Sequence, residues 1–286
     1  MKKRLFLVGN GEKECISHLA ETLLRVLESR PEAEVVGADL TCLRDLSRLE
    51  ADLVMVLGGD GTILGAVHRM GNNPLPILGI HMGQLGFLTA YLDGQMTKAV
   101  EMALTDRLRQ EPRLMAHVSV RPRPGEPPRW RARAVNDAVL GRPRGRGIMT
   151  VDVHLGGTFV GAYTGDGVIV STPGGSTAYC LSSGGPILVP DMDSFIIVPL
   201  ACHTLALRPL VIHADQGVEL SIGRESRCGS ATLVVDGQLS TEVENGELVT
   251  VEAAPEKLHL LVDPDFNFFQ SLREKFGWTG QPRYRR

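Results

Sequence analysis

The chain lacks the cysteine and histidine spacing of a metal or redox site. Its nearest cysteines, Cys180 and Cys202, are 22 residues apart, so neither a Cys-x-x-Cys pair nor a zinc-type spacing occurs. The eight histidines include no His-x-x-x-His or His-Glu-x-x-His pattern. A metal cluster is therefore not expected, and reduced cysteines favour a cytoplasmic protein.

The chain also lacks an excess of charge of one sign. Lysine and arginine total 30 against 33 acidic residues, which gives a formal net charge of −3, and the charges are spread along the chain rather than gathered in blocks. Nucleic acid and anionic membrane surfaces attract strongly basic proteins, so neither is expected as the main partner.

No apolar run is long enough to span a membrane. The most apolar stretch, Phe195–Ile212, is interrupted by Pro199 and Arg208, whereas a spanning helix needs roughly 20 predominantly apolar residues. The apolar run near the start, Leu5–Val8, is too short for the core of an export signal. We interpret that run as a first β-strand.

Glycine, in contrast, is abundant. The 32 glycines among 286 residues are about 11% of the chain, against an average usage of about 7%. Hydrophobic residues make up 43% and charged residues 22%, as in ordinary globular domains. The length suits one large domain or two ordinary ones, and the glycines indicate many tight turns or places where the backbone approaches a ligand.

The first 111 residues alternate strand and helix patterns. Continuous apolar strands between helices predict a parallel, Rossmann-like sheet that is covered on both faces, an α/β domain over residues 1–111. The expected strands are Arg4–Val8, Glu34–Val36, Leu53–Leu57 and Ile77–Ile80, and the expected helices cover Ile16–Leu27, Ile63–Met70 and a segment that Asp93 caps and Leu104 ends.

From residue 112 short β-rich runs replace the helical periodicity. We expect a sandwich-like β-rich domain over 112–264, with one helical stretch at Ser176–Ser183. Residues 265–286 return to a helix and a tail, which we expect to pack back onto the N-terminal domain. The expected strands are Leu114–Val120, Ala132–Val135, Met149–Leu155, Thr158–Tyr163, Val168–Val170, Val218–Ile222, Thr232–Val235, Leu248–Val251 and Leu258–Val262.

The densest chemical signal is Gly58–Thr62, which reads Gly-Gly-Asp-Gly-Thr directly after an apolar strand and before a helix. A helix N-terminus at the carboxyl edge of a parallel sheet binds phosphate well, and glycines allow close approach. The segment has neither the lysine of a P-loop nor the third glycine of the dinucleotide fingerprint. Asp60 would act through Mg²⁺ or take a proton from a hydroxyl. The alternative is an ordinary turn in which Asp60 caps the helix.

A second segment, Gly165–Tyr179, runs from a strand through a turn rich in Gly, Ser and Thr into a short helix. Such a turn gathers backbone amides and hydroxyls that suit the polar groups of a nucleotide. The alternative is that these residues only cap the helix. A serine nucleophile elbow is not indicated, because Gly-x-Ser-x-Gly is absent.

Together these segments resemble the NAD kinase family in content and order, from about residue 50 to the C-terminal helix. The first motif alone is weak, because diacylglycerol, sphingosine and phosphofructokinase-type kinases carry relatives of it, whereas the second is highly specific. The other matching segments are Asn136-Asp137, Gly184–Pro186, Pro199–Leu205 with Arg208-Pro209, Val235–Gln238 and Phe276–Trp278.

The resemblance implies transfer of the terminal phosphoryl group of ATP, or of another donor, to the 2′-hydroxyl of the adenosine ribose of NAD, producing NADP. It implies Mg²⁺ or another divalent cation and a homodimer or homotetramer with shared sites. Two rivals remain: a lipid or sugar kinase that shares only the first motif, and a non-catalytic NAD(P)-binding regulator, against which the intact Asp60 argues.

By resemblance, Asp60 is the base or the carboxylate that orients the hydroxyl. Phe87 resembles a residue that packs on the adenosine, and Asn136 and Asp137 match a pair that contacts the nucleotide and its ribose hydroxyls. Asp166 matches an acid near the nicotinamide half. Positions that build the phosphate-facing loop are Gly59, Gly61 and Thr62, and positions that line the dinucleotide are Thr177, Ala178, Tyr179 and Ser182.

Three positions depart from the family pattern: Asp137 stands for the usual Glu, Gly174 for Thr or Ser, and Ala201-Cys202 for an apolar residue and Pro. They bear on ligand affinity or donor preference rather than on the reaction.

The choices between NAD and NADH and between ATP and polyphosphate stay open. Near Asn136, the Arg142–Arg146 segment could meet phosphate, but we favour a solvated loop.

Overall fold

The structure is a computed structural model that describes residues 2–83, 86–143, 147–204 and 206–278. The chain divides into two compact units, Met1–Glu111 with His259–Arg286, and Pro112–Leu258. The C-terminal segment that carries the last helix thus belongs to the first unit.

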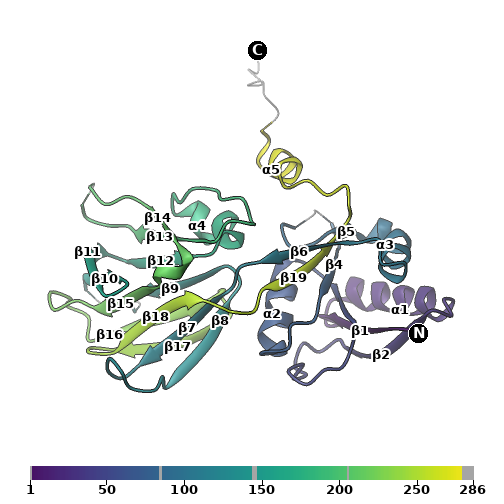
Figure 1. Ribbon diagram of the computed structural model, residues 1–286, viewed down its shortest axis with the longest axis horizontal. Coiled ribbons are helices and arrows are strands. Elements are labelled where there is room, and N and C mark those ends of the chain that lie inside the picture. Colours follow the sequence, from purple (N-terminus) through teal and green to yellow (C-terminus); the bar gives the residue numbers. More distant parts are fainter. Residues whose placement is uncertain (1, 84–85, 144–146, 205, 279–286) are drawn as a thin grey trace, which may run out of the picture. The chain divides into compact units, whose positions relative to one another are not determined.

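The first unit is built on a largely parallel sheet (Figure 1). The pairs β1–β2, β1–β3, β3–β4, β4–β5 and β4–β19 are all parallel, and every residue of β3 is buried, as its continuous apolar pattern predicts. The strand order is β2 (Ala33–Asp39), β1 (Lys3–Gly9), β3 (Leu53–Leu57), β4 (Ile77–His81), β19 (Leu258–Val262) and β6 (Arg109–Arg113), with β5 (Tyr91–Leu92) beside β4.

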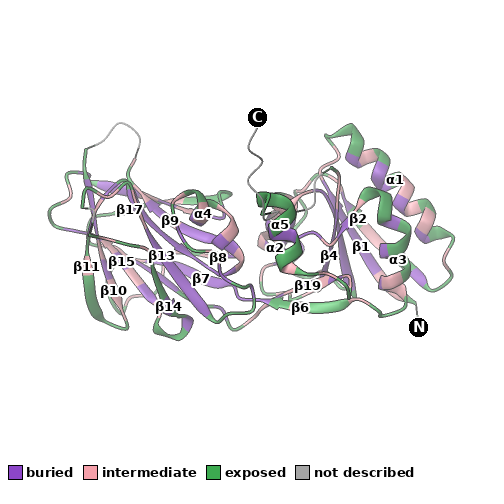
Figure 2. Ribbon diagram, turned by 90° about the horizontal axis from the view of Figure 1, so that it is seen from above, coloured by how far each residue is buried: buried purple, intermediate pink, exposed green. Residues whose placement is uncertain are grey.

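Helices cover both faces of this sheet. The helices α1 (Glu14–Glu28) and α3 (Met96–Leu104) share one apolar cluster with β1 and β3, and Figure 2 shows α2 (Asp60–Met70) on the opposite side. The α/β class expected from the sequence is therefore confirmed. The expected cap at Asp93 is wrong: Asp93 opens the 3-10 helix η1 (Asp93–Gln95), and Gln95 occupies the N-cap of α3.

The last helix, α5 (Phe268–Phe276), begins later than the expected residue 265. Its start is set by Asn267, whose side chain accepts hydrogen bonds from the backbone N–H groups of Phe269 and Gln270, and its end by Gly277 in the left-handed conformation. Leu272 is 2% exposed, whereas Phe269 is 55% exposed, so the apolar side chains of α5 are only partly buried.

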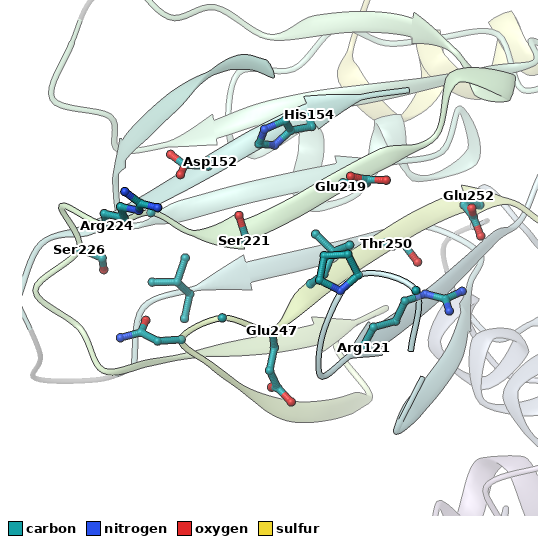
Figure 3. A pocket seen from close by; sticks show the side chains of 17 residues that line it. Arg121, Asp152, His154, Glu219, Ser221, Arg224, Ser226, Glu247, Thr250 and Glu252 are labelled. Carbon is teal, nitrogen blue, oxygen red and sulfur yellow. The ribbon is translucent and has the colours of Figure 1, made fainter. Parts of the chain in front are cut away.

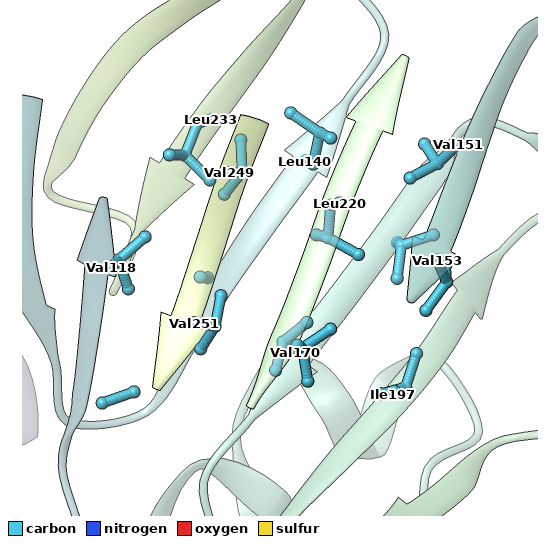
Figure 4. Packing of buried hydrophobic residues seen from close by; sticks show 14 of the residues in the cluster. Val118, Leu140, Val151, Val153, Val170, Ile197, Leu220, Leu233, Val249 and Val251 are labelled. Carbon is cyan, nitrogen blue, oxygen red and sulfur yellow. The ribbon is translucent and has the colours of Figure 1, made fainter. Parts of the chain in front are cut away.

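The second unit contains two six-stranded antiparallel sheets. Apolar side chains of both sheets, Val151 and Leu220 from one and Leu140 and Val170 from the other among them, form a single core (Figure 4). One sheet has the order β11 (Thr158–Gly165), β10 (Met149–Leu155), β15 (Val218–Ile222), β18 (Leu248–Ala253), β7 (Ala116–Arg121) and β8 (Trp130–Ala134). The other has the order β14 (Leu210–His213), β13 (Ser194–Leu200), β12 (Gly167–Ser171), β9 (Asp137–Gly141), β16 (Ser230–Val235) and β17 (Leu239–Glu244).

A smaller apolar cluster lies on the other face of β12 and β13. Cys180 of α4 (Tyr179–Ser182) packs there with Ile169 and Ile196, so the segment that follows β12 folds back over its own sheet. The single helix expected over Ser176–Ser183 is in fact the 3-10 helix η2 (Gly174–Thr177) followed by α4.

Candidate active site

The Gly58–Thr62 segment forms the turn from β3 into α2 at the carboxyl edge of the parallel sheet. Gly58 has a φ of 146°, and a Cβ there would lie 2.5 Å from the Thr62 hydroxyl oxygen, so this position requires glycine. Gly59 is the N-cap, and its carbonyl accepts a hydrogen bond from the Thr62 N–H at 2.9 Å. The first turn of α2 therefore lies at the edge where parallel sheets bind ligands.

The Asp60 carboxylate is held by a second loop. Its two oxygens accept hydrogen bonds from the backbone N–H of Phe87 at 3.0 Å and of Leu88 at 3.1 Å. A Cβ on Gly86 would lie 2.0 Å from Asp60 Oδ1, so the loop passes the carboxylate at backbone distance. A carboxylate has about four lone-pair directions, and two amides leave it free to accept further hydrogen bonds in a fixed orientation.

Phe87 is enclosed by side chains of α5. The Phe87 ring centroid lies 6.3 Å from that of Phe268 and 5.8 Å from that of Phe276, and the Lys275 Nζ lies 3.9 Å from it. Sequence reasoning missed these neighbours, because almost 190 residues separate them from Phe87 and no spacing links the two segments.

His81, at the end of β4, lies against the glycine turn. A Cβ on Gly59 would lie 2.9 Å from the His81 Nε2, and the His81 Nδ1 is buried without a hydrogen bond to any described residue. The parallel pairing of β3 with β4 brings the two strand ends together. Sequence reasoning gave His81 no role, since an isolated histidine carries no motif.

In the second unit, Asp236 organises the Asn136-Asp137 pair. Its carboxylate accepts hydrogen bonds from the N–H groups of Val135 at 2.8 Å, Asn136 at 2.8 Å and Asp137 at 3.0 Å. Asp236 and Gly237 have φ values of 51° and 66° and form the hairpin turn between β16 and β17. Beyond turning the chain, Asp236 thus fixes the backbone of two candidate site residues.

The Asp137 side chain is buried beside another acid. It is 5% exposed, and burial, with a smaller effect of the Asp236 charge, raises the pKa of Asp137 from 3.8 to about 7. The carboxyl is therefore much harder to ionise than that of an exposed aspartate. In the protonated form it donates a hydrogen bond, and in the ionised form it accepts one, so it can pair with a sugar hydroxyl in either state.

The glycine-rich turn after β12 packs directly on Asn136. The Asn136 carbonyl accepts a hydrogen bond from the Thr172 N–H at 2.9 Å, and a Cβ on Gly175 would lie 2.1 Å from the same oxygen. The hydroxyls of Thr172 and Ser176 donate to the backbone carbonyls of Val135 and Pro173, each at 2.6 Å. These two hydroxyls therefore stabilise the turn itself, but neither η2 nor α4 has a side-chain cap, so the capping alternative is not supported.

Asp166 lies between two glycines that the backbone requires. A Cβ on Gly165 would lie 2.6 Å from the Leu200 carbonyl, and one on Gly167 would lie 2.3 Å from that of Leu140. The Arg142 Nε donates to Asp166 Oδ1 at 2.6 Å. Arg142 is thus ion-paired rather than only solvated, while residues 144–146 lie outside the described residues.

Asp166, Arg142 and Tyr179 line one pocket of about 560 Å³ together with residues of β9 and β13. Tyr179 is 49% exposed, so its ring is available to a ligand. Asp137 pairs with Ser171 at one end of β9, and Gly141 pairs with Gly167 at the other. Asp137 and Asp166 therefore lie at opposite ends of one strand pair, about 16 Å apart at ~3.3 Å per residue.

The remaining expected residues follow this turn. Thr177 and Ala178 are half-buried, and the Ala178 N–H donates to the Gly175 carbonyl at 2.9 Å. The exposed Ser182 directs its hydroxyl to the Tyr179 carbonyl at 3.1 Å, within α4. The structure gathers these residues around η2 and α4, whereas Asp60, Gly59, Gly61, Thr62 and Phe87 are gathered in the first unit.

A larger hollow of about 890 Å³ lies over the sheet that contains β10, β15 and β18. Figure 3 shows Asp152, His154 and Glu219 on these strands. It contains none of the residues expected from the sequence to bind a ligand. Volume alone therefore does not locate the site.

In the described ranges, no three or more His, Cys, Asp or Glu side chains gather in a way that could hold a metal ion. No helix of the described part of the chain is long and apolar enough to cross a membrane.

Two family models match successive parts of the chain. The model of the ATP-NAD kinase N-terminal domain matches residues 21–109, and that of the ATP-NAD kinase C-terminal domain matches residues 135–262. An NAD kinase from Cellvibrio japonicus is 34% identical over 96% of this chain and 95% of its own length. The chain belongs to the NAD kinase family. A family member from Gemmatimonas aurantiaca is 38% identical over 80% of this chain and 78% of its own.

Solved structures of NAD kinases share the fold. The yeast NADH kinase complexed with NADH has a TM-score of 0.88 at 22% identity, covering 100% of this chain and 90% of that one. An NAD kinase from Archaeoglobus fulgidus in complex with ATP has a TM-score of 0.74 at 26% identity, covering 96% and 97%. The two matched family regions contain all the expected site residues, but α5 lies beyond both.

Proposed function

We propose that this protein transfers the terminal phosphoryl group of ATP to the 2′-hydroxyl of the adenosine ribose of NAD, forming NADP and ADP. One observation carries the proposal: the Asp60 carboxylate accepts the N–H of Phe87 at 3.0 Å. The acid assigned to the ribose hydroxyl and the ring assigned to the adenosine are therefore neighbours, as a reaction on the adenosine sugar requires.

In the reaction the ribose 2′-oxygen forms a bond to the terminal phosphorus, the bond from that phosphorus to ADP breaks, and the hydroxyl proton passes to Asp60. A carboxylate is a weak base for a sugar hydroxyl, which ionises far above neutral pH. Phosphoryl transfer has a loose transition state, so the carboxylate orients the hydroxyl first and takes the proton late. Such a role contributes about 10²–10⁴ in rate.

The turn that contains Gly59, Gly61 and Thr62 faces the phosphates of the donor. The N–H groups at the start of α2 and the partial positive charge of the helix N-terminus favour anions there. Mg²⁺ enters with the nucleotide as MgATP, since magnesium is usually held by substrate phosphates with one or two carboxylates. When bound with the nucleotide, this ion would supply positive charge to the phosphates.

The second unit holds NAD. Asn136 and Asp137 contact the nucleotide and its ribose hydroxyls, and a water bridges Asp137 to the sugar because its side chain is one methylene shorter than the usual Glu. Asp166 lies near the nicotinamide half, and Tyr179 presents an exposed ring in the same pocket. The ligand surface is completed by Thr177, Ala178 and Ser182. We also propose a cytoplasmic homo-oligomer with subunit-shared sites.

The test is a product assay with the purified chain, NAD, ATP and Mg²⁺, in which chromatography resolves the 2′- from the 3′-phosphorylated dinucleotide. We expect the 2′ product and no product when the metal is chelated. Diacylglycerol and fructose 6-phosphate serve as rival acceptors. Phosphorylation of either in place of NAD, or binding of NADP without turnover of NAD, would contradict the proposal.

A further inference from the structure

The C-terminal helix places one cation beside the catalytic turn. The Lys275 Nζ lies 3.9 Å from the centroid of the Phe87 ring, and the Phe87 N–H donates to the Asp60 carboxylate at 3.0 Å. All three residues belong to the first unit. A contiguous set of contacts therefore leads from the ammonium of α5 to the acid at the start of α2.

The surroundings of this ammonium are unusual for a surface lysine. The residue is exposed, yet partial desolvation of its ammonium lowers the pKa of Lys275, and the charge of Asp60 opposes this shift. Within the described part of the chain, Lys275 has the aromatic contact but neither a hydrogen bond nor a salt bridge. Its three N–H donors are thus unused next to a site at which phosphate reacts.

The reaction needs positive charge at this place. Negative charge spreads over the three outer oxygens of the phosphoryl group in the transition state, and the Gly58–Thr62 turn lacks the lysine of a P-loop. The only charged side chain within the turn, Asp60, is itself an anion. A lysine from elsewhere in the chain would offset both charges.

We propose that Lys275 binds the transferred phosphate, exchanging the face of the Phe87 ring for the phosphoryl oxygens beside Asp60 when nucleotide binds. The inference rests on the proposed function. Adenosine packing on Phe87 competes for the ring, and a charge-assisted hydrogen bond to phosphate is stronger than an exposed cation–π contact. Lys275 stays protonated throughout, because the hydroxyl proton goes to Asp60.

The same lysine would also distinguish the product NADP from the substrate NAD. After transfer, the new phosphate is attached to the 2′-oxygen that Asp60 orients, and it remains within reach of the ammonium. Lys275 therefore discriminates NADP from NAD in binding as well as accelerating the transfer.

The experiment compares K275M and K275R with the unaltered protein. We expect K275M to lower kcat and the affinity for NADP by about 10- to 100-fold each, the range of a hydrogen bond to a charged group, with little change in the KM or Kd for NAD. K275R keeps the charge and should restore most of both. Calorimetric titration with NADP and with NAD gives the affinity ratio, which a merely structural role would not change.

The matched control is R273M on the same helix. It removes the same charge two positions earlier, about 200° around the helix axis, and should leave kcat and the affinity ratio unchanged. If K275M fails to fold, K275Q makes the same comparison. An unchanged kcat and NADP-to-NAD ratio in an active K275M would overturn the inference, whereas absence of NADP formation by the unaltered protein would overturn the proposed function instead.

Discussion

Two acids of the candidate site, Asp60 and Asp137, are placed in opposite ways. Asp60 is partly buried at a helix N-terminus, and its carboxylate accepts two backbone N–H groups. Asp137 is 5% exposed beside a second carboxylate, with its pKa raised to about 7. The first carboxylate is oriented by two backbone amides, and burial makes the second one hard to ionise. The same side chain thus serves two roles because its surroundings differ.

The largest effect is expected where the oriented anion is removed. D60N retains the shape of the side chain but cannot take the ribose proton, so kcat should fall by about 10²–10⁴ while NAD still binds. Steady-state assays together with titration of NAD measure both quantities. NADP formation at the rate of the unaltered protein would exclude Asp60 as the proton acceptor.

The buried acid should show itself in the pH dependence of stability. Between pH 3.8 and about 7 the unfolded state has lost the Asp137 proton while the folded state keeps it, so the free energy of unfolding falls as pH rises through this range and levels off above it. D137N should remove this fall, and at pH 8 it should be more stable than the unaltered protein by up to about 4 kcal/mol. Urea denaturation at pH 5 and pH 8 measures the difference, and parallel curves for the two proteins would contradict it.

Asp236 should contribute to stability because it holds the backbone of three residues. D236A leaves the N–H groups of Val135, Asn136 and Asp137 without their acceptor, which should lower the free energy of unfolding by about 3 kcal/mol. D236N keeps one oxygen and tolerates the positive φ, so it should lose less. Equal losses in the two variants, measured by chemical denaturation, would show that the amides do not depend on this side chain.

The smallest effects are expected in the glycine-rich turn, where two adjacent positions differ. A Cβ on Gly174 would lie 3.5 Å from its nearest neighbour, the Thr172 hydroxyl, whereas one on Gly175 would lie 2.1 Å from the Asn136 carbonyl. G175A should therefore cost about 1–3 kcal/mol of stability and displace Asn136, and G174A less than about 0.5 kcal/mol. Thermal melting and NAD titration compare the two variants. A larger loss of stability in G174A than in G175A would contradict the prediction that Gly175 is the more tightly packed position.

Local sequence pattern determined much of the fold. The bounds of β3, β10, β15 and β19 are those that the apolar runs predict. The pattern missed β13 and β14 because Pro199 and Arg208 interrupt that stretch, and it missed β17, in which polar residues predominate. It also gave no sign that β19 leaves the β-rich region and pairs with β4.

The candidate site likewise has features that the sequence predicted and features that only the fold revealed. The sequence by itself determined which residues could form the site. The turns around Asp60 and Asp166 need glycines at fixed positions, and this requirement is visible in neighbouring residues of the sequence. Only the tertiary structure decided that Lys275 lies over Phe87, that Asp236 holds the Asn136-Asp137 backbone and that Arg142 pairs with Asp166. These contacts join residues that are from 24 to almost 190 positions apart. Periodicity records which face of an element is buried, and the packing of whole elements decides what that face meets.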